Sequence, residues 1–422
     1  MKRILYLTVA VLLTACTARE PLSLAVVHSE MQRNPEASCI DGLEGRLKWN
    51  YTTGLELKAF LDVYDRLTNE GANDRPASPG AGGISSQGLS SGPGKKYQSP
   101  AAQKLLNYVD AWYDAIIAED GTIGVNYKKE NYSTDHICPG RTLFRLYDIT
   151  GKEKYRRAMD RLYEQLQEQP RTPEGGFWHK KIYPQQMWLD GIYMAQPFYA
   201  EYAARYLEGP EQAAAFEDIV RQMSLVADRT FDEATGLFRH AWDASHAQFW
   251  CDPATGQSAH AWGRAMGWYT MALVDVLPLI PEDTPGADRL QSLLRHIANQ
   301  LPRYADPQTG MWYQVLDRPG AEGNYVEATC SAMFVYALLK GCRLGCLDCP
   351  DYARESYGKL LKTFVTREDG LVTLNRCCEV AGLGGKENRS GDYTYYINEK
   401  IRSNDPKGIG PLIWAALEYE CL

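Results

Sequence analysis

The sequence predicts an all-α fold, an (α/α)6 barrel in which six helical hairpins form a ring and short β stubs occupy the outer-to-inner loops. Two observations lead to this prediction. Helical segments of two kinds alternate along the 422 residues. A turn followed by an aromatic or β-branched stub also recurs at intervals of roughly 55–80 residues, which is an internal repeat.

The first kind of segment is amphipathic, with apolar residues three or four positions apart on one face. Such helices have one wet side, so we expect them on the outside of the ring. The apolar faces are Leu24, Val27, Met31; Leu105, Val109, Trp112, Ile116; Tyr155, Met159, Leu162, Leu166; Phe216, Ile219, Met223, Val226; Leu290, Leu293, Ile297, Leu301; and Tyr357, Leu360, Phe364.

The second kind is apolar nearly all round and contains small residues that allow close packing, so these helices should line the centre. They span about 50–66, 136–148, 189–206, 262–279, 326–341 and 407–419. The turns and stubs between outer and inner helices read EDGTIGVNY, PEGGFWHK, DEATGLFRH, DPQTGMWYQ and REDGLVTL. Because all of them join an outer helix to an inner one, they must gather at one end of the barrel.

We expect a single catalytic domain over residues 17–422. The Gly/Ser/Pro-rich stretch 71–95 almost lacks large apolar side chains, which predicts a flexible insertion within that domain. The net charge of −8 gives no electrostatic footprint for nucleic acid. We expect a monomer.

The N-terminus predicts a secretion signal over residues 1–16. It has a basic start, a short apolar run and small residues before Cys16. The ending Leu-Thr-Ala-Cys resembles a bacterial lipoprotein box, which implies cleavage before Cys16 and lipidation of its sulfur. The protein would then be exported and anchored to a bacterial membrane, where it would face the periplasm or the cell surface. We expect this to be the outer membrane. An ordinary signal peptide with an incidental cysteine is the alternative.

Eleven cysteines in an exported chain raise the question of disulfides or a metal. Cys342, Cys346 and Cys349, with Cys377 and Cys378 further on, could be imagined as a zinc site. This spacing without a matched second pair or a nearby histidine is a weak metal signature. We therefore favour a local disulfide or free thiols.

Polar and aromatic residues are concentrated at the predicted starts of inner helices and in one stub, within 132–141, 186–194, 238–245, 260–269 and 323–332. Flat aromatic rings stack on sugars, carboxylates transfer protons, and arginine pairs with a carboxylate, so this rim is typical of a carbohydrate site. Asp190 and Asp135 also stand where a helix N-cap belongs, and Trp262 and Trp268 could be core residues. Arg264, on an otherwise apolar helix, requires a partner.

The sequence gives no support to serine hydrolase, zinc protease, nucleotide-binding or dinucleotide-binding functions. An HExxH pair, a Walker loop and a GxGxxG turn are absent from the sequence, and its GxSxG match at residues 88–92 falls in the Gly/Ser/Pro-rich stretch, where no nucleophile elbow is expected. Carboxylates in a helical ring remain.

Several long segments, in order between about residues 30 and 420, resemble the unsaturated rhamnogalacturonyl hydrolases, family 105 of the glycoside hydrolases. They are SEMQRNPEA, KWNYTTGL, PEGGFWHKKIYPQQMWLDGIYMAQPFYAEYA, WGRAMGWYTMALVDVL, GNYVEATCSAMFVYALLKG and AGLGGKENRSGDYTYYINEKIRSNDPKGIGP. The resemblance implies the six-hairpin barrel. It also implies release of 4,5-unsaturated galacturonic acid from the non-reducing end of lyase-generated pectin oligosaccharides.

The resemblance also implies roles for individual residues. Asp190 of the WLDG motif would be the general acid/base that protonates C4 of the vinyl ether before water adds at C5, and Asp135 would help place substrate and water. Trp188, Tyr193 and Met194 could supply the apolar setting that favours the protonated acid. The sugar would be bound by His240, Trp262, Arg264, Trp268, Trp188, Trp49, Tyr51 and Lys407, with Arg264 as the candidate for its carboxylate. The resemblance implies no cofactor and no metal.

Four other functions stay open at this point. An unsaturated glucuronyl hydrolase would keep the mechanism and change the linkage or the second sugar. An ordinary inverting glycosidase would not require the double bond. A noncatalytic surface glycan-binding lipoprotein would use the aromatic residues without turnover, and a zinc-dependent lanthionine-cyclase-like toroid is more remote.

Overall fold

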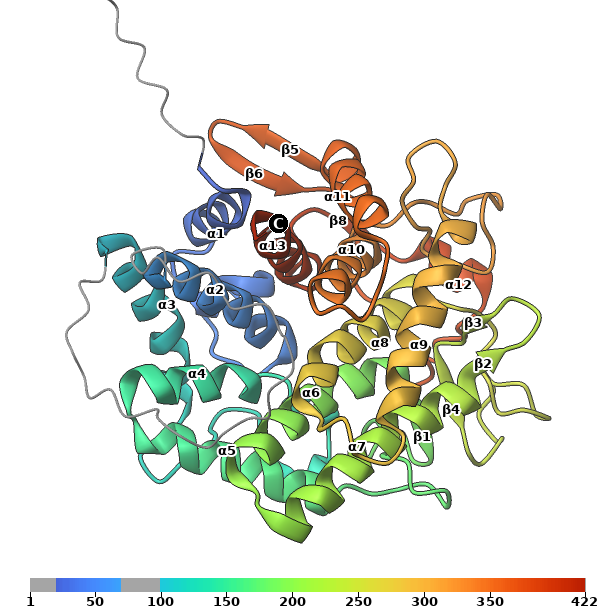
Figure 1. Ribbon diagram of the computed structural model, residues 1–422, viewed down its shortest axis with the longest axis horizontal. Helices are drawn as coiled ribbons and strands as arrows, with labels where there is room; N and C mark the ends of the chain where they lie inside the picture. Colours follow the sequence, from blue (N-terminus) through green and yellow to red (C-terminus); the bar gives the residue numbers. More distant parts are fainter. Residues whose placement is uncertain (1–19, 70–98, 422) are drawn as a thin grey trace, which may run out of the picture.

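The computed structural model describes residues 20–69 and 99–421. Its helices form two concentric rings (Figure 1). The predicted signal segment with Cys16 and the predicted insertion at 71–95 lie outside the described residues.

The inner ring consists of α2 (Tyr51–Asn69), α4 (Gly140–Thr150), α6 (Leu189–Tyr206), α8 (Gly263–Val276), α10 (Ala328–Arg343) and α13 (Pro406–Glu420). Each of these helices packs against the next, and α13 returns to α2, so that the ring is closed. Every residue of α8 is buried, as the all-round apolar pattern predicts. The predicted (α/α)6 barrel is confirmed.

The outer ring consists of α1 (Leu22–Arg33), α3 (Pro100–Ile116), α5 (Glu153–Gln167), α7 (Gly209–Thr230), α9 (Ala287–Gln300) and α11 (Pro350–Phe364). These helices bury one face only. In α9, the buried residues are Leu290, Leu294 and Ile297, three or four positions apart. None of the helices in the described ranges has the length and hydropathy to cross a membrane.

The β stubs of the outer-to-inner loops are two-stranded and antiparallel. Two of them are local hairpins, β2 (Phe231–Asp232) with β3 (Leu237–Phe238) and β5 (Val365–Glu368) with β6 (Leu371–Leu374). A third joins two separate loops, β1 (Gln186–Trp188) with β4 (Ala241–Asp243). The fourth, β7 (Cys377–Cys378) with β8 (Ile401–Arg402), pairs two parts of the connection between α11 and α13. The last of these loops also carries the short helix α12 (Tyr393–Asn398).

Single turns of 3-10 helix complete the structure. They are η1 (Ala37–Gly42), η2 (Lys129–Asn131), η3 (Thr134–His136), η4 (Leu277–Leu279) and η5 (Leu301–Tyr304).

Glycines let the inner helices approach one another closely. A Cβ atom added to Gly267 of α8 would lie 2.6 Å from the sulfur of Met333 in α10. A larger side chain at this position would push apart two neighbouring helices of the ring.

Candidate active site

Asp190 is the second residue of α6, and its side chain is 15% exposed. The residue before the helix is Trp188, and it makes no capping hydrogen bond. Asp135 lies in the middle of the short helix η3, whose N-cap is Ser133. The N-cap interpretation of both aspartates is therefore wrong, and neither residue occupies the N-cap position of a helix.

His240 lies directly beside Asp190. The pairing of β1 with β4 brings the two loops together, and the amide of Leu189 donates a hydrogen bond of 3.1 Å to the His240 carbonyl. The His240 Nε2 atom is then 3.1 Å from Asp190 Oδ2, although the two atoms do not align as a hydrogen bond. Sequence reasoning expected mainly apolar groups around Asp190, and the structure adds a fully buried imidazole.

Trp262, Arg264 and Trp268 follow one another at the start of α8, and all three are buried. The Arg264 guanidinium lies 4.9 Å from the centre of the Trp262 ring. Its Nη2 group donates to the carbonyl of Cys378 at 2.8 Å, but Nε and Nη1 have no partner among the described residues. A buried guanidinium with two unused donors is suited to bind an anion.

Arg264 stays protonated in spite of burial. Burial by itself would lower its pKa, but the surrounding groups, including Glu327 and Asp405, raise it above its ordinary value. Asp405, the N-cap of α13, is likewise kept in its charged form by neighbouring groups. Burial would raise the pKa of that carboxyl, but Lys407, Arg264 and Arg402 lower it.

Asp135 forms an ion pair with Lys180 and lies 3.7 Å from Nε2 of His179. Burial would raise the pKa of Asp135, but the charges of Lys180 and His179 and the hydrogen bond from Lys180 lower it. Asp135 is therefore ionised at neutral pH and can only accept hydrogen bonds. Burial and the neighbouring Lys180 lower the pKa of His179 to about 4, so its imidazole is neutral.

Trp188 belongs to a stack of rings beside the two aspartates. Its indole lies 4.6 Å from the His179 ring and 4.9 Å from the Tyr183 ring, nearly parallel to both. It also meets His240 edge-on at 5.3 Å. Trp188 therefore holds the two histidines of the site in place.

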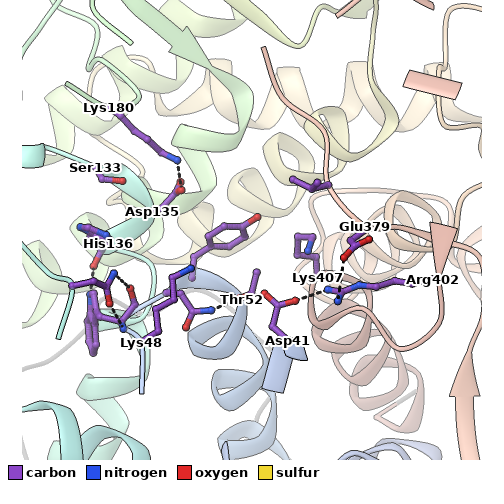
Figure 2. A pocket seen from close by; sticks show the side chains of 15 residues that line it. Asp41, Lys48, Thr52, Ser133, Asp135, His136, Lys180, Glu379, Arg402 and Lys407 are labelled. Carbon is purple, nitrogen blue, oxygen red and sulfur yellow. Dashed lines mark hydrogen bonds and ion pairs between the residues drawn. The ribbon is translucent and has the colours of Figure 1, made fainter. Parts of the chain in front are cut away.

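A cavity of about 450 Å³ opens at this end of the barrel (Figure 2). Of the residues predicted for the site, Tyr51, Asp135 and Lys407 line it together with Trp49. The charges of Asp135, Arg264 and Asp190 all act on the Tyr51 hydroxyl, whose pKa is raised by burial. Asp135 lines the cavity, whereas Asp190 and Arg264 are not among its lining residues and are linked to it through Tyr51.

Lys407 and Trp49, two of the predicted sugar-binding residues, have their charge or ring already engaged by other protein groups. Lys407 is almost fully buried, and its ammonium is 2.9 Å from Asp405 Oδ1, so its charge is already paired. Trp49 borders the cavity, but its ring is completely buried and stacks on Trp112 of α3 at 5.6 Å. The structure thus places the Trp49 ring in the core, whereas Tyr51 contacts the edge of Trp268 at 6.4 Å.

Sequence reasoning missed four residues that the fold brings to this site, namely His179, Lys180, Tyr396 and Asp405. The first two stand in the stub just before the WLDG motif, so proximity in sequence could have indicated them. Tyr396 and Asp405 come from the last loop, within the segment 381–411 that carries the family resemblance, but nothing in that segment singled them out. In the described ranges, no three His, Cys, Asp or Glu side chains are grouped as metal ligands.

Comparison with known proteins identifies the family. The model of Glycosyl Hydrolase Family 88 matches residues 86–422. A family 105 glycoside hydrolase from C. acetobutylicum ATCC 824 is 39% identical, with 96% of this chain and 100% of that chain covered and a TM-score of 0.82.

Two curated relatives are also similar to this chain. The 24.9 kDa protein in the picA locus of Rhizobium radiobacter is 39% identical over 53% of this chain and 97% of its own length. The unsaturated rhamnogalacturonyl hydrolase YesR of Bacillus subtilis (strain 168) is 28% identical over 69% of this chain and 77% of its own length. The chain belongs to the unsaturated glycuronyl hydrolases of glycoside hydrolase families 88 and 105, and it is a glycosidase.

Proposed function

We propose that this glycosidase releases 4,5-unsaturated galacturonic acid from the non-reducing end of rhamnogalacturonan oligosaccharides that a pectin lyase has produced. The observation that carries the proposal is Arg264, a buried guanidinium with two donors that have no partner among the described residues. It lies over the ring of Trp262, which contacts His240 beside Asp190. A uronate carboxylate satisfies these donors, and the ring then lies against the acid. The similarity to YesR supports galacturonate linked to rhamnose as the substrate.

In the proposed reaction, protonated Asp190 donates its proton to C4 of the double bond. The positive charge that develops at C5 is quenched by water, and the Asp190 carboxylate accepts the proton that the water loses. The hemiketal formed at C5 then opens and releases the next sugar. His240, 3.1 Å from Asp190, is placed to stabilise the carboxylate between the two proton transfers.

Asp135 has a different role in this scheme. Its pKa is lowered, so it is ionised at neutral pH and is unsuited to donate a proton. Fixed by Lys180, it can accept hydrogen bonds from a sugar hydroxyl or from the attacking water. The two aspartates thus divide the acid and the positioning functions between them.

The proposed substrate differs from other unsaturated uronides only in the second sugar and its linkage. The double bond removes the stereochemistry at C4, so unsaturated galacturonate and glucuronate ends are identical. An unsaturated glucuronyl hydrolase would therefore show the same site with a different preference for the leaving sugar.

The decisive experiment follows the ultraviolet absorbance of the conjugated alkene in an unsaturated galacturonyl-rhamnose disaccharide. Wild type should remove the signal, and Asp190→Asn should be slower by about 10²–10⁴-fold, because the proton donor is lost. Asp148→Asn, an exposed carboxylate at the end of α4 that pairs with Arg205, is the matched control and should retain full activity.

Other outcomes would redirect the assignment. If only unsaturated uronyl disaccharides with a second sugar other than rhamnose are turned over, rhamnogalacturonan is not the substrate. Equal rates for saturated and unsaturated substrates would indicate a conventional glycosidase, and binding without turnover of either would indicate a glycan-binding protein.

We also propose that the protein is exported and anchored through a lipid on Cys16. The basis is the sequence of residues 1–16 alone. Labelling of cells with a radioactive fatty acid should mark the wild-type protein and leave Cys16→Ser unmarked. Equal labelling of both proteins would overturn the proposal.

A further inference from the structure

Tyr396 contacts the side of His240 that faces away from Asp190. It lies on α12 in the last loop of the barrel, and its side chain is fully buried. Its hydroxyl oxygen is 2.7 Å from Nδ1 of His240, while Nε2 of the same ring faces Asp190. The three side chains form a line that ends at the acid.

The Tyr396 ring is itself held firmly. It stacks on Trp262 at 5.9 Å with an interplanar angle of 21°. Gln314 donates from Nε2 to the Tyr396 carbonyl at 3.2 Å and accepts at Oε1 from the Trp262 indole at 3.1 Å. The same glutamine therefore fixes the tyrosine and the tryptophan that flank His240.

We infer that Tyr396 is the positioning residue that sets the tautomer of His240 and thereby directs the proton of Asp190. The inference rests on the proposed function, since it assigns a proton-donor role to Asp190.

The direction of the Tyr396–His240 hydrogen bond follows from burial. Burial raises the pKa of Tyr396 well above its ordinary value, so the phenol keeps its proton. In the described part of the chain, His240 Nδ1 is the only hydrogen-bond partner of this hydroxyl. A buried O–H group left unused is costly, so the hydroxyl donates to Nδ1.

The tautomer of His240 then determines where the proton of Asp190 resides. Because Nδ1 accepts, the hydrogen of the neutral imidazole is on Nε2, which faces Asp190 Oδ2. With a hydrogen-bearing nitrogen only 3.1 Å away, Oδ2 is the unfavourable place for a second hydrogen, so the acid form of Asp190 carries its proton on Oδ1. The titratable or charged groups that act on Tyr396 are Tyr395, Asp190, Asp317 and Arg389, and His179 lies close enough to sense His240.

The tautomer can be measured directly. In two-bond ¹H–¹⁵N correlation spectra of the wild-type protein, assigned with His240→Asn, we expect the pattern of the Nε2–H tautomer. Tyr396→Phe should change this pattern, whereas Tyr393→Phe on the same helix should not, because Tyr393 bonds a carbonyl on another loop. An Nδ1–H pattern in wild type, or an unchanged pattern in Tyr396→Phe, would overturn the inference.

Kinetics provide the second readout. Tyr396→Phe should lower kcat by about tenfold or more with little change in KM, and should shift the limbs of the pH–rate profile. A lowered kcat with an unshifted profile would mean that Tyr396 acts only through packing. If wild type shows no turnover of any unsaturated uronide, the proposed function fails, but the spectra still test the tautomer.

A pair of cysteines elsewhere carries an independent inference. Cys342 lies in the last turn of α10, and Cys349 immediately precedes α11. Their sulfur atoms are 3.6 Å apart, and both residues are half-buried. The pair lies in an inner-to-outer connection, away from the loops that form the active site.

We propose that Cys342 and Cys349 form a reversible disulfide when they meet a thiol–disulfide oxidant. The hydrogen bond with Cys349 lowers the pKa of Cys342 to about 7 against the opposite effect of burial, so its thiolate is available. This thiolate attacks the oxidant's disulfide and expels one thiolate. Cys349, on losing its proton, then attacks the Cys342 sulfur and expels the second, so two protein thiols are oxidised and one disulfide is reduced to two thiols.

Peptide mapping tests the pair with oxidised glutathione as the probe. After alkylation and trypsin digestion, the peptide GCR (341–343) should be linked to LGCLDCPDYAR (344–354), and dithiothreitol should reverse the link. Cys346→Ser should keep the link. Cys349→Ser should lose it and show a glutathione adduct on Cys342. Separate peptides in the wild type, or loss of the link in Cys346→Ser, would overturn the proposal.

Discussion

In the proposed function, Arg264 defines the charge of the substrate. It is buried on an apolar helix, and one of its donor groups binds a backbone carbonyl while two have no partner in the part of the chain that the structure describes. A carboxylate ligand converts this unfavourable burial into a charge-assisted pair.

Replacing Arg264 should therefore reduce binding of the uronate selectively. We expect Arg264→Lys to lower kcat/KM by about 10–100-fold, because the planar pair of donors is lost. The measurement is turnover of the natural disaccharide and of an analogue whose carboxyl group has been reduced to an alcohol. The exposed Arg343, which pairs with Glu418, supplies the control Arg343→Lys. Equal losses on both substrates would show that Arg264 does not bind the carboxylate.

Among the elements, α6 depends on the glycine that follows the acid. A Cβ atom on Gly191 would lie 2.8 Å from Nδ1 of His179, a ring that is held by Thr134 and stacked on Trp188. Because this ring cannot move away easily, the glycine fixes how closely the start of α6 approaches the Asp135 side of the site.

We expect Gly191→Ala to displace the first turn of α6, which lowers kcat and reduces the free energy of unfolding by about 1–3 kcal/mol. Activity assays and chemical denaturation would measure the two effects. Gly358→Ala is the control in the middle of α11, where an added Cβ meets nothing within 4 Å. That change should be neutral or stabilising by roughly 0.5–1 kcal/mol. Full activity in Gly191→Ala would refute the close-contact argument.

The packing of α1 against α2 includes two buried carboxyl groups, Glu30 and Glu56. Burial raises the pKa of Glu30 to about 7 in spite of its ion pair with Arg33. Burial and the charges of Glu30, Asp41 and Asp405 raise the pKa of Glu56 well above its ordinary value, with Arg402 acting in the opposite sense. Such groups stabilise the fold below the pKa of the unfolded chain, and this stability is lost as the pH rises through the folded pKa.

Glu56→Gln should therefore stabilise the protein more at pH 8 than at pH 5, because glutamine resembles the protonated acid that the folded state prefers. Thermal unfolding at the two pH values measures the difference. Glu355→Gln, on the exposed face of α11, should show no such dependence. A variant that is less stable than wild type at pH 8 would contradict the assignment.

Across the whole molecule, the barrel is tied together at the end of α8 remote from Arg264. Asp275 is buried and binds Arg141 of α4 at 2.8 Å and Lys340 of α10 at 2.6 Å. Eleven residues of helix separate Asp275 from Arg264, about 16 Å along the axis. Burial would raise the pKa of Asp275, but Lys340 and Arg141 lower it far below its ordinary value.

Asp275→Asn should reduce the free energy of unfolding by about 3–5 kcal/mol at pH 7, since two buried cations lose their partner. A carboxyl with a lowered pKa contributes stability above its unfolded pKa, and that contribution is lost as the pH falls. The gap between variant and wild type should therefore narrow towards pH 2 in chemical denaturation.

The kcat of folded Asp275→Asn should stay within about threefold of wild type. The exposed Asp351→Asn should leave stability nearly unchanged. A variant as stable as wild type at pH 7 would contradict the role of Asp275 as a tie between inner helices.

The sequence by itself determined the architecture and the residue types of the site. Helical periodicity, such as Leu290 and Ile297 on the wet-faced helix α9, is a local property, and its sixfold repetition leaves little freedom in the fold. The turns that follow the outer helices place Asp135, Asp190 and His240 at one end, so their common location could also be predicted.

Only the tertiary structure decided which of these residues face each other. His240 and Tyr396 are 156 residues apart, and their contact cannot be predicted from any periodic pattern in the sequence. The contact arises because the closing loop folds over the start of α8, and the Trp49 ring turns to Trp112 for a similar non-local reason. Long-range packing fixes the protonation and the free donors of the site, and these properties depend on neighbours that the linear chain does not reveal.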